Sequence, residues 1–184
     1  MSHEIKDPVG FLLSVMESQA GFKNFEGISR LEHGLQSATN AEQNGATSAL
    51  IVASLLHDIG SILRANHPDL AGDPERGHEE IGAKVLVRWF GPEVTEPIAL
   101  HVMAKRYLVA TEAGYAGKLS PISVKSLKAQ GLPLTASESD AFLALPYAKD
   151  ALALRHWDEA AKISGAVTPS LEHFRHHVEA WLSP

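Results

Sequence analysis

The sequence predicts an all-α protein that folds as a single bundle of helices. Apolar residues recur at helical spacing along most of the chain, and Pro and Gly residues separate these runs. No segment alternates apolar and polar residues as a strand would, and no internal repeat is visible. The length of 184 residues suits one domain, so we expect residues 1–184 to form one unit.

The expected helices follow from this spacing in chain order. A first helix starts at Asp7-Pro8, because proline at the first helical position loses no hydrogen bond. The next four helices run from about 28 to 44–45, from about 47 to 64, from 78 to 91–92 and from about 94 to 108. A short helix follows from 120–121 to about 130, and another begins at the capping box at 135–138. The last two helices cover 152–162 and 171–182. Two prolines and two glycines in residues 64–77 predict a loop long enough to act as a rim or a lid.

Composition excludes several classes of function. A formal net charge of -6 argues against a general nucleic-acid binder or a binder of anionic membranes, because both need clustered basic charge. The absence of cysteine excludes disulfides, thiolate metal ligands and a cysteine nucleophile. The first residues resemble neither a signal peptide nor a membrane anchor, so we expect a cytoplasmic protein. Nothing in the sequence indicates an obligate protein partner.

The most informative stretch is the pair His57 and Asp58 inside the apolar run from Leu50 to Leu63. Burying two ionisable groups costs several kcal/mol unless something pairs with them. A metal ion suits a neutral imidazole beside an ionised carboxylate. A hydrogen-bonded His-Asp pair that joins two helices is the alternative, and the dipeptide alone does not decide between them.

Other candidate ligands lie on helices that have a buried face. They are His33, His78, His101 and Asp158. Together with His57 and Asp58 they exceed what one ion needs, but they suffice for two ions that share Asp58 as a bridge. Ligation by imidazole and carboxylate alone fits Fe, Mn and Zn alike.

This order of residues resembles the metal-dependent HD superfamily in its binuclear form. The closer resemblance is to its mixed-valent diiron oxygenases, which include the PhnZ-type enzymes that cleave the carbon-phosphorus bond of 1-hydroxyphosphonates. It extends from about Phe25 to Lys162, through the strings LEHGLQ, LLHDIG, HEEIGA, HVMAKRYL, LS.IS.KSL..QG.P and LR.WDE.AK. HVMAKRYL and LR.WD are more specific than the HD pair, and they separate this group from the phosphohydrolases of the superfamily.

The resemblance implies a Fe(II)/Fe(III) pair, with dioxygen as cosubstrate. One iron would be held by His33, His57, Asp58 and Asp158, and the second by Asp58, His78 and His101. The residues implied around the phosphonate are Lys105, Arg155, Ser123, Ser126 and Gln130, with Glu26 near the amino group of the substrate.

Spacing along the chain agrees with these implied roles. Lys105 comes four residues after His101, and Arg155 three before Asp158, so each cation shares a helix face with a candidate ligand. The residues at 123, 126 and 130 place two hydroxyls and an amide on one stripe of a helix. Two cations and several donors beside a metal pair describe a pocket for a small, multiply charged oxyanion.

Two positions depart from the family pattern. Ser61 stands where these enzymes often have a histidine that helps to hold the phosphonate. Lys23 stands where the aminohydroxyethylphosphonate enzyme has a tyrosine that caps the iron. A trimethylammonium head would need aromatic walls, for which Phe22, Phe25 and Tyr115 are candidates.

The function expected from these observations is cleavage of a 1-hydroxy-2-(amino or trimethylammonio)ethylphosphonate with O2. The products would be phosphate and either glycine or glycine betaine. The alternatives are a binuclear phosphohydrolase that acts on a small phosphate ester and a non-catalytic domain that senses a phosphorylated metabolite. Of the other histidines, His156 is a candidate support for a ligand, and we expect His173, His176 and His177 to form a solvated face.

Overall fold

The computed structural model describes residues 5–23, 27–73 and 75–183, and it confirms the all-α class. In these ranges the only β pairing is an isolated bridge between Lys23 and Ser29. The helices are α1 (Pro8–Glu17), α2 (Arg30–Gln43), α3 (Ser48–Leu56), α4 (Ile59–Asn66), α5 (Pro68–Ala71), α6 (His78–Leu86), α7 (Pro92–Thr111), α8 (Tyr115–Lys118), α9 (Pro121–Gln130), α10 (Ala136–Leu143), α11 (Ala148–Ala160), the 3-10 helix η1 (Leu171–Phe174) and α12 (Arg175–Ala180).

Short-range hydrogen bonds fix where several of these helices begin. The Asp7 carboxylate accepts from the third residue of α1, Gly10, at 2.9 Å. Ser29 and Glu32 form a reciprocal capping box at the start of α2. A second capping box, of Thr135 and Glu138, starts α10 where the sequence predicts it.

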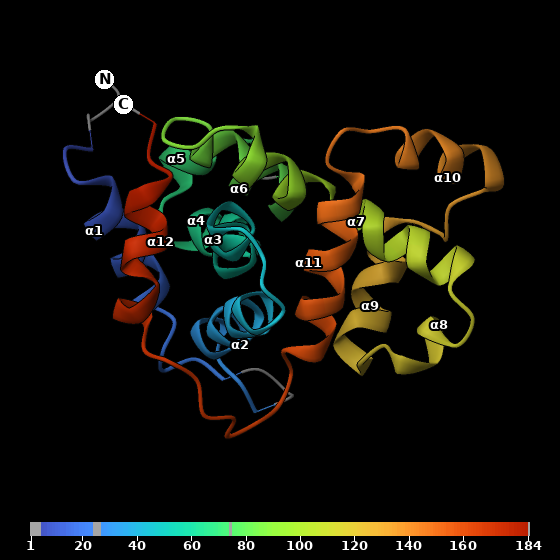
Figure 1. The fold of residues 1–184 in the computed structure, drawn as a ribbon, viewed down its shortest axis with the longest axis horizontal. Coiled ribbons are helices and arrows are strands. Elements are labelled where there is room, and N and C mark those ends of the chain that lie inside the picture. Colours follow the sequence, from blue (N-terminus) through green and yellow to red (C-terminus); the bar gives the residue numbers. More distant parts are fainter. Residues whose placement is uncertain (1–4, 24–26, 74, 184) are drawn as a thin grey trace.

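The helices pack around α3, which lies near the centre of the bundle (Figure 1). Every residue of α3 from Ala49 to Leu56 is buried. The main apolar cluster draws on α1 to α7, α11, η1 and α12. A smaller apolar cluster joins α7, α10 and α11, on the side of the molecule where α8 and α9 also lie (Figure 1).

The expected continuous helix over 47–64 is wrong in one respect: it is broken at His57 and Asp58. α3 ends at Leu56, α4 begins at Ile59, and the two helices are bent by 44°. Adjacent residues of a straight helix point about 100° apart, so the break is what allows both side chains to face one centre. By length and composition, no single helix among the described residues could span a membrane, and α3 with α4 meets that criterion only as a bent pair.

The polar segment after α4 is not the uninterrupted loop that its composition predicts. It contains the short helix α5, and Ala71 of this helix is buried in the main apolar cluster. None of its described residues lines the cavity of the candidate site.

Candidate functional site

Three of the four candidate imidazoles are oriented by backbone carbonyls. In each, Nδ1 lies within hydrogen-bonding distance of a carbonyl oxygen: His33 with Ala161 (2.8 Å), His57 with Ser54 (2.8 Å) and His101 with Ile98 (2.7 Å). A ring that donates through Nδ1 has a lone pair on Nε2. Histidine ligands of protein metal sites are commonly held in this way.

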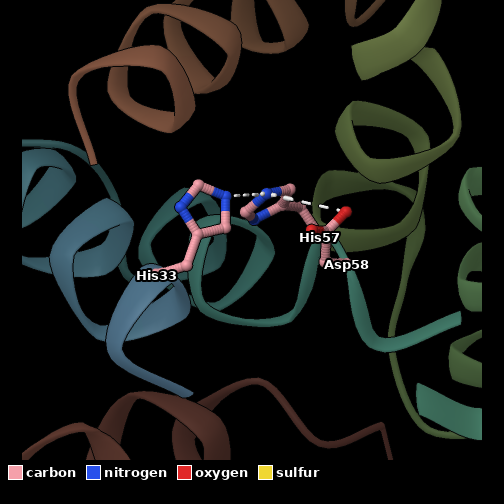
Figure 2. Close-up of side chains that lie close together, drawn as sticks. All are labelled: His33, His57 and Asp58. Carbon is pink, nitrogen blue, oxygen red and sulfur yellow. Dashed lines mark hydrogen bonds and ion pairs between the residues drawn. The ribbon is translucent and has the colours of Figure 1, made fainter. Parts of the chain in front are cut away.

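The ring nitrogens opposite these contacts face one another. Nε2 of His33 lies 3.2 Å from Nε2 of His57, and Figure 2 shows the two rings turned together beside Asp58. Nε2 of His78 and Nε2 of His101 are 3.1 Å apart. Two lone pairs at this distance repel each other unless a proton or a metal ion lies between them. The donor set therefore fits metal ions.

Carboxylates complete two groups of possible ligands. Oδ1 of Asp58 lies 3.1 Å from Nε2 of His78 and 3.9 Å from Nε2 of His57. Among the described residues, His33, His57 and Asp58 form one group and Asp58, His78 and His101 the other, with all ligand atoms of a group within 4.8 Å. Oδ1 of Asp158 lies 3.2 Å from Nε2 of His33. The six predicted ligands therefore lie together, and Asp58 belongs to both groups.

The backbone at the helix break does not use the Asp58 side chain as a cap, so the carboxylate can take part in both ligand groups. Asp58 is the N-cap of α4, yet its side chain makes no capping hydrogen bond. A carboxylate at an N-cap normally accepts a backbone N–H of the first turn. Gly60 lets α6 approach closely, since a Cβ there would lie 1.9 Å from the carbonyl oxygen of His78. The break and the close approach together bring His78 beside Asp58.

Burial and charge give most of these groups the protonation states that a metal needs. Burial lowers the pKa of His57, and burial with the neighbouring His78 lowers that of His101 to about 3. Burial alone would raise the pKa of Asp58, but adjacent imidazoles, that of His57 first, hold it well below its usual range. The pKa of Asp158 is likewise held low, mainly by Arg155. Neutral imidazoles and ionised carboxylates result.

The other two imidazoles have raised pKa values. Burial by itself lowers the pKa of His33, but the hydrogen bond and charge of Asp158 outweigh it. Burial also lowers the pKa of His78, but the hydrogen bond and charge of Asp58 outweigh this effect and raise it. A metal ion that binds here would replace a proton shared within each pair.

Two buried cations lie in the same cavity as the metal-ligand groups. This cavity has a volume of about 440 Å³, and Lys105 and Arg155 both line it. Nζ of Lys105 donates to Oγ of Ser126 at 2.8 Å and to the Gln130 amide oxygen. Burial and the nearby Arg155 lower the pKa of Lys105 to about 8. A buried lysine of this kind favours an anionic ligand, which would restore its charge.

Arg155 is held on several sides. Its Nε donates to the Tyr115 hydroxyl at 2.9 Å, and its two terminal nitrogens donate to Asp158 and Glu159. Burial alone would lower its pKa, but these partners, Asp158 first, raise it. Tyr115 is buried and does not line the cavity, so it is not the aromatic wall that the sequence suggests.

The cavity brings together most of the predicted site residues. Those that line it are His33, Asp58, Ser61, His78, His101, Lys105, Ser123, Ser126, Gln130, Arg155 and Asp158. His57 is buried behind them. Lys23 and Phe22 line the cavity as well, whereas Glu26 and Phe25 lie outside the described residues.

Sequence reasoning missed two charged residues: Glu159 near the end of α11, and Lys162, two residues after α11 ends. Lys162 lines the cavity, with Nζ 2.7 Å from Oγ of Ser123. Glu159 lies behind the lining and accepts from Lys162 at 2.7 Å. Glu159 is four residues after Arg155 and Lys162 four after Asp158, so helical spacing could have found both.

The histidines outside the site differ in part from expectation. Nε2 of His156 lies 3.5 Å from a carboxylate oxygen of Glu112, so among the described residues its ion-pair partner is Glu112 and not a candidate ligand. His173 and His176 are exposed as predicted. His177 is partly buried, with Nδ1 2.8 Å from Oγ of Ser48, so this residue does not belong to a solvated face.

Comparison with known proteins agrees with this geometry. The HD domain model matches residues 30–129, which include all the candidate ligands except Asp158. The chain is 42% identical over 161 residues to the hydroxymethylphosphonate dioxygenase of Gimesia maris, covering 85% of this chain and 79% of the relative. It is 44% identical over 150 residues to the [1-hydroxy-2-(trimethylamino)ethyl]phosphonate dioxygenase (glycine-betaine-forming) of Leisingera caerulea, covering 81% and 76%.

A third relative is the uncharacterized protein L432 of Acanthamoeba polyphaga mimivirus. It is 30% identical over 161 residues, covering 86% of this chain and 74% of the relative. The family model matches more than half of the chain, and all three relatives match most of it. The chain therefore belongs to the HD-domain family, in the group that contains these two phosphonate dioxygenases.

Proposed function

We propose that this protein uses O2 to cleave the carbon-phosphorus bond of a small 1-hydroxyphosphonate, releasing phosphate and a carboxylic acid. The observation that carries the proposal is the shared cavity: two groups of metal ligands face the buried cations Lys105 and Arg155. The identity of 42% and 44% to two enzymes named as phosphonate dioxygenases supports the same reaction.

The metal centre in this proposal is a pair of iron ions. His33, His57, Asp58 and Asp158 would hold one ion, and Asp58, His78 and His101 the other. A redox-inactive ion such as Zn²⁺ does not supply the electrons that O2 chemistry requires, so iron is preferred to zinc. When bound, the Fe(II)/Fe(III) pair would supply Lewis acidity and a redox-active site for O2, while oxidation of the substrate supplies the electrons that reduce O2 overall.

The chain itself supplies the binding of the phosphonate. Lys105 and Arg155 neutralise its charge, because they are buried cations on the cavity wall. Ser123, Ser126 and Gln130 on α9 lie beside these two cations and provide further hydrogen bonds. Burial of Lys105, Arg155 and Ser123 limits access of water to the phosphonate and strengthens each charge-charge interaction.

The substituent on the second carbon of the substrate is the part that the proposal leaves with alternatives. We propose the 1-hydroxy-2-(amino or trimethylammonio)ethylphosphonates, which would give glycine or glycine betaine. Among the described lining residues, the charged groups outside the metal ligands are all cations, including Lys23 and Arg30 near the start of α2. Phe22 is the aromatic residue of this lining that could hold an ammonium group, and we propose that Glu26, which lies outside the described residues, supplies the opposite charge. Hydroxymethylphosphonate, which has no second carbon, belongs in the same substrate panel.

We also propose that the 184 residues form one domain and work in the cytoplasm. Helices from both ends support the first point, because α1 and α12 pack into the same apolar cluster as α3. The absence of cysteine, which suits a reducing compartment, supports the second.

Oxygen uptake and phosphate release, measured together in iron-loaded protein, test the reaction. The panel contains hydroxymethylphosphonate and the 2-amino and 2-trimethylammonio substrates. We expect one O2 consumed for each phosphate released, and no release without O2. Lys105→Met should abolish turnover at low substrate concentration, whereas Lys128→Met, at an exposed site of α9, should not. Phosphate released anaerobically from a phosphate ester, with none from the phosphonates, would instead indicate a phosphohydrolase.

A further inference from the structure

The helix that carries three of the proposed phosphonate contacts has almost no apolar anchorage. Ser123 is the only buried residue of α9, and Val124 is 38% exposed. Neither apolar cluster of the described residues contains a residue of α9. Hydrophobic burial therefore contributes little to the position of this helix, and polar contacts must determine it.

On the α11 side, the carboxylate of Glu159 contacts α9 at two points, in addition to the direct contact between Lys162 and Ser123. Oε1 accepts from the backbone N–H of Ser120, the N-cap of α9, at 3.0 Å. Oε2 accepts from Oγ of Ser123 at 3.0 Å, from Nζ of Lys162 at 2.7 Å and from Arg155. One side chain thus fixes both the start of the helix and the cations opposite it.

Glu159 itself does not reach the cavity. Ser123, Arg155 and Lys162 line the cavity, and Glu159 lies behind all three. A carboxylate also interacts favourably with the positive end of a helix dipole, which is where Oε1 meets α9. Apart from the long-range effect of its charge, Glu159 can therefore affect a bound anion only through the three groups that it holds.

We propose that Glu159 is a positioning residue for the substrate: it docks α9 on α11 and aims Ser123, Arg155 and Lys162 at the phosphonate. Lys162 thereby becomes a third cation of the phosphonate site. This inference rests on the proposed function, because it takes a phosphonate as the ligand of the cavity.

For Glu159→Gln, the proposal and simple electrostatics predict opposite changes in anion affinity. Glu159→Gln removes a negative charge behind an anion site, so charge alone would make an anion bind more tightly. Loss of positioning would make it bind more weakly, since a displacement of about 1 Å in a binding group can cost about 100-fold. Glu159→Asp keeps the charge but shortens the side chain, so it tests separately whether the carboxylate must extend as far as Ser120 and Ser123.

The test measures binding of methylphosphonate, which lacks the C1 hydroxyl, to metal-loaded protein by calorimetry. We expect Glu159→Gln and Glu159→Asp to weaken binding at least about tenfold while metal content stays at the wild-type level. Hydrogen exchange of the α9 amides should become faster in both variants. Glu172→Gln is the matched control, because Glu172 forms an exposed ion pair with Arg175 on η1 and α12.

The outcomes separate this inference from the proposed function. Equal or tighter binding by Glu159→Gln, with unchanged exchange in α9, would overturn the positioning role and leave the function intact. Wild-type affinity in Glu159→Asp would show that the length of this side chain does not matter, which also contradicts positioning. If the wild-type protein does not bind methylphosphonate, the phosphonate site is wrong, and the positioning role is wrong with it.

Discussion

Replacing Gly60 with alanine tests how the helix break builds the metal centre. Gly60 is the second residue of α4, and an added Cβ would lie 1.9 Å from the carbonyl oxygen of His78 and 2.6 Å from the amide nitrogen of Gly82. Both are backbone atoms of α6, so no side-chain rotation can relieve the clash. The two helices would have to separate by about 1.5 Å to reach an ordinary contact of 3.4 Å.

This separation should affect both stability and metal binding. Overpacking of a well-packed interface costs about 1–3 kcal/mol, and a backbone clash lies at the upper end. For a chain of this size, about 3 kcal/mol corresponds to a fall in Tm of about 6–12 °C. His78 would move away from Asp58, 3.1 Å from it in the structure, so the ion held by Asp58, His78 and His101 should be lost first.

Thermal unfolding and metal analysis of purified protein provide the assay. Gly82→Ala is the matched control on the same interface, because its Cβ would meet no atom closer than 3.4 Å. Alanine also favours a helix over glycine by about 1 kcal/mol, so this control should keep or gain stability. A Gly60→Ala variant with wild-type Tm and two bound metals would refute the account of the close approach.

Three further predictions concern the cavity. Asp58→Asn should leave at most one bound metal per chain by elemental analysis, because Asp58 belongs to both ligand groups, whereas the exposed Asp69→Asn should keep two. The affinity for methylphosphonate should fall as pH rises through about 8, the pKa of Lys105, with only about one tenth of this lysine protonated at pH 9. Unchanged affinity from pH 7 to 9 would count against a role for its charge. Removing the metals with a chelator should lower the free energy of unfolding by about 4 kcal/mol for each site, if the free metal concentration was about 1,000 times the Kd of that site. The Tm should fall and should return when metal is added back. An unaltered Tm would argue against a structural contribution from the metals.

The chemistry of the site could be predicted from local features of the sequence. His57 and Asp58 stand out because ionisable groups in an apolar helical run need a partner. Lys105 and Arg155 could be placed near the ligands because residues three or four apart share a helix face. The same spacing indicates the stripe of α9 that lines the cavity. Helix period and residue type are properties of short segments, so the all-α fold and these candidates follow without a structure.

Other features depend on contacts between segments far apart in the chain. The break at Asp58 is not visible in the apolar pattern, which continues through it, and neither is the close approach of α6 to Gly60. Tyr115 suggested an aromatic wall, but packing places its hydroxyl on Arg155.

Glu159 illustrates the division between the two kinds of information. Its place in the sequence shows only that it shares a helix face with Arg155. The structure adds Ser120 and Ser123 from another helix to the same carboxylate. The sequence by itself determined which chemical groups are available and which face of a helix each occupies, because both are local properties. Only the tertiary structure decided which groups meet, because that depends on how the whole chain packs.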